Sequence, residues 1–371
     1  MKKRLFKNID WSILICTIFL LAIGLFAIYS ANLNANQEEL TEFTKQIIWI
    51  VVSIPFVIFI TIMEYDTIAK ISPILYGVML ISLVAVLFTT PISGATSWFT
   101  LGSFSIQPSE FAKIITILFL AMVMSRMKQK GGKREINRIT RLILLFIIVG
   151  VPLALIIKQP DYGTAMAFIL AFVVMLYTGG INKAYIITGI LTVVIAVPLL
   201  YMFVLPEHAK TRIDVFLNPD IDPRGAGYNL TQSKLAIGAG ELWGMGYLKG
   251  NQTQLGFLYP KSTDFIFSVI GEELGFVFAA AIIILYVVLI TKAITVAKTA
   301  KDDLGAMIAS GIAGIFLFHM TENIGMTIGL LPITGVPLPF VSYGGSSLLS
   351  NLIMIALLLN ISGRRQKSIF M

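Results

Sequence analysis

The sequence has few of the residues that build disulfide-rich proteins and metal sites. It contains one cysteine and two histidines among 371 residues. Because Cys16 has no partner, an intramolecular disulfide is excluded, and its apolar neighbours indicate a small core residue rather than a nucleophile. His208 and His319 are too few and too far apart in the sequence for a metal-binding cluster, so we predict no metal ligands.

Motifs for nucleotide binding and for serine hydrolysis are also missing. The sequence has no Walker loop, no dinucleotide-binding fingerprint and no Gly-x-Ser-x-Gly elbow. Only 13% of the residues are charged, which is low for a soluble enzyme. ATP-driven transport therefore has no support in this sequence.

Apolar residues dominate instead, at 57% of the chain with a mean hydropathy of +0.86. Apolar stretches of about 18 to 25 residues recur, and each is long enough to cross roughly 30 Å of hydrocarbon as a helix. The predicted spans are residues 11–31, 46–63, 68–88, 109–126, 142–158, 163–178, 184–205, 265–291, 304–329 and 346–362. We therefore expect an all-α polytopic membrane protein, a single domain over residues 1–371 with about ten transmembrane helices.

Basic residues predict the orientation of these spans. Lys and Arg cluster at the start of the chain, in 126–141, in 292–301 and in the tail 364–367, all on one face of a ten-span arrangement. That face is predicted to be cytoplasmic with both termini inside, and 206–263 becomes a large extracellular loop between the seventh and eighth spans. The first span is expected to remain as an anchor, because it is too long for a signal-peptide core. The basic clusters favour anionic lipid over nucleic acid as a partner.

Two charged residues lie near the start of the fourth span, and a charge inside a span costs roughly 2.5 to 3.5 kcal/mol on insertion scales. Glu110 and Lys113 are three residues apart and share one helical face near the predicted outer end. They can form a purely structural pair or bind a third group together. Glu322 and Asn323 in the ninth span are weaker candidates of the same kind.

Further candidates lie outside the spans. Asp161 and Lys158 flank a very short predicted turn, which Pro160 favours whatever the function. Arg212 is one of several cations in 206–263, against the usual charge bias of outer loops. These cations can serve an anionic ligand or can simply be solvated.

Asp264 lies where the outer loop enters the eighth span, and two interpretations have equal weight. It can cap the helix N-terminus, which is worth about 1 kcal/mol. Alternatively, an ionised carboxylate at the water–lipid boundary can accept a proton from a hydroxyl or hold a divalent metal ion. Glu272 and Glu273 lie roughly 12 to 14 Å further along a continuous helix. They are expected to lock helix contacts, either protonated or paired with an interior lysine such as Lys113.

Two glycine-rich segments complete the set. Residues 236–250, "AIGAGELWGMGYLKG", can make close backbone contacts or form a flexible surface loop. Residues 329–347, "GLLPITGVPLPFVSYGGSS", contain three prolines and four glycines between the last two spans. Because non-helical backbone near membrane depth must be buried or line a cavity, we expect this segment to form a cleft wall.

Several motifs together resemble one family over nearly the whole chain. "QPSEFAK", "QPDYGTA", "FLNPDIDPRGAGYNLTQSKLAIGAG", "TDFIFSVIGEELG" and "LLPITGVPLPFVSYGGSS" occur in the order and spacing of the SEDS proteins of shape, elongation, division and sporulation. Through "TGVPLPF" the sequence is most similar to the RodA branch. The resemblance implies a ten-helix peptidoglycan glycosyltransferase that polymerises lipid II on the outer face of the bacterial plasma membrane during elongation.

The resemblance also implies roles for individual residues. The family's essential acidic residue falls on Asp264, and its substrate-binding residues fall on Glu110, Lys113, Asp161 and Arg212. We add Trp98, although Ser97 precedes it where many members have arginine. Lys158 and the cations of the loop 206–263 are candidates to replace that arginine.

The implied reaction transfers a lipid-pyrophosphate-linked glycan to the 4-hydroxyl of another lipid II, with inversion. Asp264 then acts as general base, and Lys113, Arg212 or a bound Mg²⁺ or Mn²⁺ supports the departing pyrophosphate. The implied partners are a class B penicillin-binding protein and other elongation proteins.

Three alternatives remain open: a lipid II flippase, a division or sporulation paralogue, and a non-catalytic scaffold. The polar candidates gather in the predicted outer half, whereas a transport path should be lined across the whole membrane. This distribution favours the enzyme.

Overall fold

The computed structural model describes residues 8–33, 40–91, 95–102, 104–203 and 207–365. Within these ranges the chain forms ten long helices. They are α2 (Trp11–Asn32), α3 (Leu40–Ile62), α4 (Tyr65–Ala85), α5 (Pro108–Ile136), α6 (Ile139–Lys158), α7 (Tyr162–Gly179), α8 (Lys183–Phe203), α12 (Ile266–Thr299), α13 (Asp303–Thr327) and α14 (Gly345–Gly363). A 3₁₀ turn, η1 (Val86–Phe88), extends α4, and the hairpin β1 (Phe99–Leu101) and β2 (Phe104–Ile106) precedes α5.

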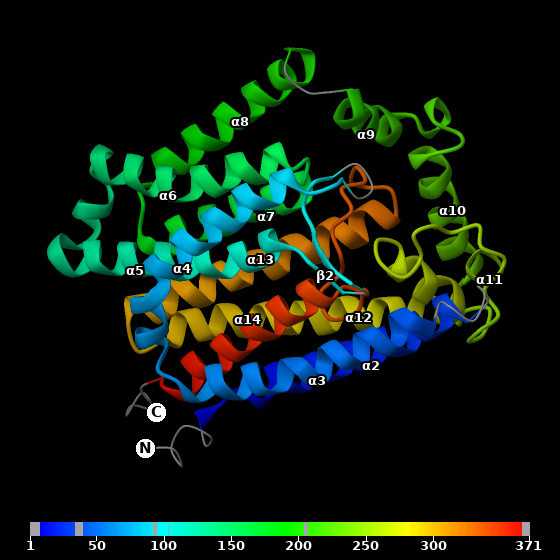
Figure 1. Ribbon diagram of the computed structural model, residues 1–371, viewed down its shortest axis with the longest axis horizontal. Coiled ribbons are helices and arrows are strands. Elements are labelled where there is room, and N and C mark those ends of the chain that lie inside the picture. Colours follow the sequence, from blue (N-terminus) through cyan, green and yellow to red (C-terminus); the bar gives the residue numbers. More distant parts are fainter. Residues whose placement is uncertain (1–7, 34–39, 92–94, 103, 204–206, 366–371) are drawn as a thin grey trace.

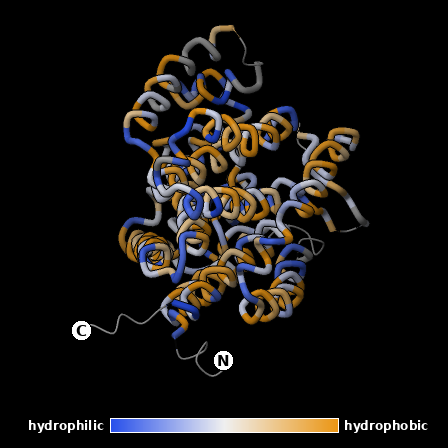
Figure 2. Tube along the Cα trace, turned by 90° about the vertical axis from the view of Figure 1, so that its left-hand side faces the viewer, coloured by the Kyte–Doolittle hydropathy of each residue, from blue (hydrophilic) through white to orange (hydrophobic). Residues whose placement is uncertain are grey.

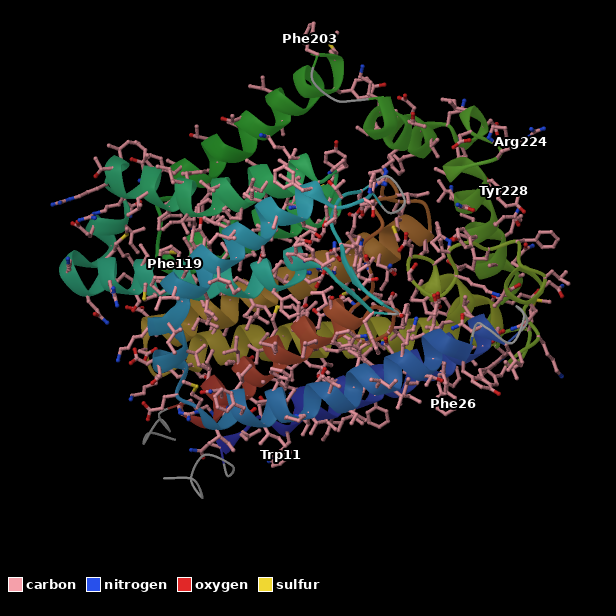
Figure 3. All side chains as sticks on the ribbon, viewed as in Figure 1. Trp11, Phe26, Phe119, Phe203, Arg224 and Tyr228 are labelled. Carbon is pink, nitrogen blue, oxygen red and sulfur yellow. The ribbon has the colours of Figure 1, made fainter. Side chains whose placement is uncertain are left out.

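Nine helices of the described part of the chain are long and apolar enough to cross a bilayer. The tenth helix, α8, is 21 residues long and lies where the span 184–205 is predicted. Figure 2 shows hydrophobic residues along helices throughout the molecule, and large apolar side chains such as Phe59 and Ile81 are exposed. Trp11 and Phe26 lie on the outer surface of α2 (Figure 3). Helices that are apolar all round are typical of a membrane protein, so the predicted fold class is confirmed.

The two ends of the bundle differ. In Figure 1 the start of α2 and the end of α14 lie at one end, and α9, α10 and α11 lie at the other. We call the latter the loop end. Residues 1–7 and 366–371, which include basic residues used to predict the orientation, lie outside the described residues. That the loop end faces the cell exterior stays a prediction.

The segment 206–263 is largely helical rather than an irregular loop. It contains α9 (Glu207–Leu217), η2 (Pro219–Ile221), α10 (Ala226–Ala239) and α11 (Asn251–Gln254). Ser233 of α10 donates its hydroxyl to the Thr327 carbonyl at 2.7 Å and lies 2.7 Å from the Ser268 hydroxyl. This buried contact fixes α10 against α12 and α13.

Helix α12 is broken at Gly275, which has φ 76° and ψ −175°. The broken backbone groups pair with the segment 241–246. The four bonds run from Phe276 N to Glu241 O (2.9 Å), from Val277 N to Leu242 O (3.2 Å), from Met245 N to Glu272 O (2.9 Å) and from Gly246 N to Glu273 O (3.1 Å). A Cβ on Gly244 would lie 2.2 Å from the Glu273 carbonyl oxygen, so this crossing requires glycine. The glycines of 236–250 thus serve close backbone contact.

The buried carboxylates beside this break bind neutral donors. Glu272 accepts the Gln252 N–H at 2.6 Å and both the N–H and the hydroxyl of Thr253 at 2.9 and 2.6 Å. Glu273 accepts the Ser30 hydroxyl at 2.6 Å and the Gln254 amide at 2.8 Å. They lock helix contacts as expected. Of the two alternatives, pairing with Lys113 does not occur, because that lysine is bound to Glu110 and His319.

Candidate active site

Asp264 lies in the turn before α12, and the N-cap of that helix is Phe265. The capping interpretation of Asp264 is therefore wrong: the turn continues one residue further than expected. Its carboxylate lies beside the segment between α13 and α14 instead, because a Cβ on Gly335 would lie 3.4 Å from Asp264 Oδ2. The side chain is thus available for chemistry rather than for capping.

Arg212 of α9 lies near this carboxylate. Its Nη1 donates to the Thr334 carbonyl at 3.2 Å, directly before Gly335. Burial raises the pKa of the Asp264 carboxyl above its ordinary value of 3.8, while a hydrogen bond with Thr263 and the charge of Arg212 oppose that rise. A carboxylate with a raised pKa beside a cation can take up a proton from a hydroxyl group.

Glu110 and Lys113 form the predicted direct pair in the first turns of α5. Lys113 Nζ lies 2.9 Å from Glu110 Oε1, and both residues are buried. Ser350 of α14 donates its hydroxyl to the other Glu110 oxygen at 2.8 Å. Lys113 is only 1% exposed, so its ammonium group is enclosed by protein.

His319 of α13 is the third partner of this pair, and sequence reasoning missed it. Its Nε2 lies 2.9 Å from Lys113 Nζ, and its Nδ1 lies 3.1 Å from the Pro337 carbonyl. Because a carbonyl only accepts, Nδ1 must carry the proton, and Nε2 then accepts from the lysine ammonium. The available signal was its spacing from Glu322 and Asn323, which places three polar side chains on one face of an apolar helix.

Asp161 is the N-cap of α7. Its carboxylate accepts the Thr164 N–H at 3.1 Å, the Gln107 amide at 2.9 Å and the Ser109 hydroxyl at 3.0 Å. Burial raises the pKa of Asp161 above its ordinary value, and the hydrogen bonds from Thr164 and Ser109 oppose the rise. Asp161 thus joins the start of α7 to the start of α5, close to Glu110.

Lys158 directly precedes the same turn, and Trp98 follows a residue that is hydrogen-bonded to it. Lys158 is the last residue of α6 and is exposed, at one end of a groove of about 780 Å³. The groove is otherwise lined by apolar residues and glycine of α4 and α6. Trp98 is half-buried, and the preceding Ser97 donates its hydroxyl to the Gln159 carbonyl at 3.2 Å. The structure therefore groups Asp264 with Arg212, and it groups the other five candidates around the starts of α5 and α7.

At Asp264 the protein offers a carboxylate, and a Mg²⁺ or Mn²⁺ held there would take its remaining ligands from water and substrate phosphates. Within the described residues, no three His, Cys, Asp or Glu side chains come together as a metal site. The neighbours of Asp264 are a cation and the segment at Gly335.

Comparisons with known proteins agree with this architecture. The family model described as "Cell cycle protein", FtsW/RodA/SpoVE, matches residues 10–367. The peptidoglycan glycosyltransferase RodA of Treponema pallidum is 31% identical, over 98% of this chain and all of its own length. The peptidoglycan glycosyltransferase MrdB of Escherichia coli is 39% identical over 75% of this chain and 74% of its own. Relatives named FtsW and stage V sporulation protein E match as well.

A solved structure supports the same conclusion. A chain from a study of polymerization and crosslinking by a peptidoglycan synthase complex superposes with a TM-score of 0.81. The two are 26% identical, and the alignment covers 95% of this chain and 97% of that one. The chain described here thus belongs to the cell cycle protein family of FtsW, RodA and SpoVE.

Proposed function

We propose that this chain is an inverting peptidoglycan glycosyltransferase that polymerises lipid II at the outer face of the plasma membrane. The observation that carries the proposal is the half-buried Asp264 carboxylate beside Arg212 at the loop end of a membrane bundle. The glycosyltransferase names of the relatives support it. The elongation role follows the resemblance to the RodA branch.

In the proposed step, Asp264 takes the proton of the 4-hydroxyl of the acceptor sugar. The hydroxyl oxygen then bonds to the anomeric carbon of the donor from the face opposite the leaving group. The bond between that carbon and the pyrophosphate oxygen breaks, and the pyrophosphate leaves with the electron pair. General base catalysis typically contributes about 10²- to 10⁴-fold to such a rate.

Cations stabilise the charge that develops on the leaving group. We assign the direct contact with the leaving pyrophosphate to Arg212. Its guanidinium lies beside Asp264, and Arg212 is half-buried rather than fully enclosed by protein. Lys113 is enclosed by Glu110 and His319. We therefore assign Lys113 and Glu110 to a buried wall of the substrate site, without direct contact with the leaving group. Asp161 orders the same wall, and Trp98 and Lys158 lie at its edge.

The groove between α4 and α6 suits the polyprenyl chain of a substrate. Its apolar lining follows α6 from Ile143 to Lys158, and Lys158 supplies one positive charge at the end next to Asp161. An apolar chain with an anionic phosphate at one end matches this distribution. This match supports a lipid-linked substrate whose chain stays beside the helices.

The comparison with a solved structure also suggests a protein partner. The related solved chain comes from work on coordinated polymerization and crosslinking. We propose that this chain works with a class B penicillin-binding protein, which would crosslink the new strands, and with other proteins of cell elongation.

Labelled lipid II supplied in detergent tests the function. No membrane separates two compartments there, so a flippase produces no polymer whereas a polymerase does. We expect glycan strands on electrophoresis from the purified protein with its penicillin-binding partner. Absence of strands from this mixture would contradict the enzyme and favour the carrier.

A further inference from the structure

Three buried polar side chains of α13 form hydrogen bonds with the segment 334–337. His319, Glu322 and Asn323 are 1%, 5% and 0% exposed. Their spacing of three and four residues places them on one helical face. We call them the α13 polar row.

Asn323 makes the central contact of this row. Its Nδ2 donates to the Asp264 carbonyl at 2.9 Å and to the Val336 carbonyl at 2.8 Å. One amide group thus ties the turn that carries Asp264 to the segment that faces its carboxylate. Both hydrogens of Nδ2 are used in these two bonds.

The other two members hold the neighbouring candidates. Glu322 accepts the Thr334 hydroxyl at 2.8 Å, and the Thr334 carbonyl accepts Arg212. His319 joins the Pro337 carbonyl to Lys113. The row therefore connects to Asp264, Arg212 and Lys113 at the same time, although these residues come from three distant parts of the sequence.

We propose that Asn323 is a positioning residue of the glycosyl transfer, which fixes the Asp264 turn against the segment 334–337. The proposal rests on the proposed function. Asn323 touches no reacting atom itself, and it acts through the backbone of Asp264. Because a displacement of about 1 Å at a reacting group can cost about 10²-fold, loss of this amide should lower kcat far more than it changes KM.

Asn360 of α14 provides a matched control. It is equally buried, and its Nδ2 also donates to two backbone carbonyls, those of Ile60 and Met63. It lies near the opposite end of the bundle, close to Arg364. Asn323→Leu and Asn360→Leu therefore each remove two amide-to-carbonyl bonds at similar burial, and Asn360→Leu also removes the bond that Arg364 donates to Asn360 Oδ1.

The experiment compares lipid II polymerisation and thermal unfolding of the two variants. We expect both to unfold at lower temperature. We expect only Asn323→Leu to lose about 100-fold in kcat, with KM within about twofold of wild type, and to show a displaced acidic limb in its pH profile. Equal kcat in the two variants would overturn the positioning role and leave the proposed function intact. Wild-type protein that makes no polymer would instead overturn the proposed function.

A second variant covers the case in which Asn323→Leu does not fold. Thr334→Val keeps the shape of the side chain and removes only the hydroxyl that binds Glu322. Because this bond also holds the segment 334–337 against α13, we expect a severalfold lower kcat, together with a lower unfolding temperature, since the buried Glu322 loses its partner. Wild-type kcat in Thr334→Val would contradict the positioning role of the contacts between α13 and this segment.

Discussion

At the residue scale, the acid–base behaviour of Asp264 follows from its surroundings. Burial raises its pKa, and the positive charge of Arg212 limits the rise. A general base works only when it is deprotonated, so polymerisation should fall as the pH drops through this raised pKa, above the ordinary value of 3.8.

Arg212→Leu tests the electrostatic part of this relation. Without the arginine charge, the carboxylate is less stable and its pKa rises further. The acidic limb of the kcat/KM profile should therefore move to higher pH, whereas Arg212→Lys should keep it near the wild-type position. A limb that stays in place or moves to lower pH in Arg212→Leu would refute the coupling.

Gly335→Ala tests the space in front of the carboxylate. Gly335 has φ +75°, so alanine there is strained by about 1–2 kcal/mol. Its new methyl group would also contact Asp264 Oδ2. Gly256→Ala is the control, because its φ is +78° and nothing lies within 4 Å of the added carbon.

The two glycine variants should therefore lose similar stability and differ in activity. We expect kcat to fall about tenfold in Gly335→Ala, equivalent to about 1.4 kcal/mol in the transition state, and to remain near wild type in Gly256→Ala. Equal kcat values in a single polymerisation assay would show that the carboxylate does not need this space.

At the element scale, the apolar runs predict the helices because each must be long enough to cross the bilayer. They do not predict the break in α12, since Gly275 is non-helical only together with the distant segment 241–246. The helical content of 206–263 is missed for a similar reason. The short α9, α10 and α11 are stabilised by packing such as that of Ser233 rather than by an apolar run.

The groove between α4 and α6 yields a prediction on substrate length. Gly150 lines it, and no atom lies within 4 Å of a carbon added there. Gly150→Phe should fill the groove and raise KM for a long-chain lipid II, while a short-chain analogue keeps its KM. Gly189→Phe in α8 is the control, since Gly189 is equally open and lies outside the groove.

Steady-state polymerisation with the two substrates measures this difference. An unchanged KM for the long chain in Gly150→Phe would exclude the groove as the chain site. A rise that also occurs in Gly189→Phe would point to a general effect of bulk on the membrane surface.

At the scale of the whole molecule, the sequence predicts which residues belong to the candidate site but not the contacts that connect them. Glu110 and Lys113 are identified because charges are costly in an apolar span. Asp264 is identified by its place at the start of the eighth predicted span and by the family resemblance. The connection between them is not predicted, because it runs through His319 and Asn323, whose partners are far away in the sequence. Such contacts exist only after the helices have packed.

The central claim is that the Asp264 carboxylate removes the proton of the acceptor hydroxyl, and one measurement tests it most directly. The rate of lipid II polymerisation is compared between wild type, Asp264→Asn and the control Asp66→Asn. Asp66 lies in the first turn of α4, and its side chain is 52% exposed. The mechanism predicts a loss of about 10²- to 10⁴-fold in Asp264→Asn and a wild-type rate in Asp66→Asn. A wild-type rate in Asp264→Asn would contradict it.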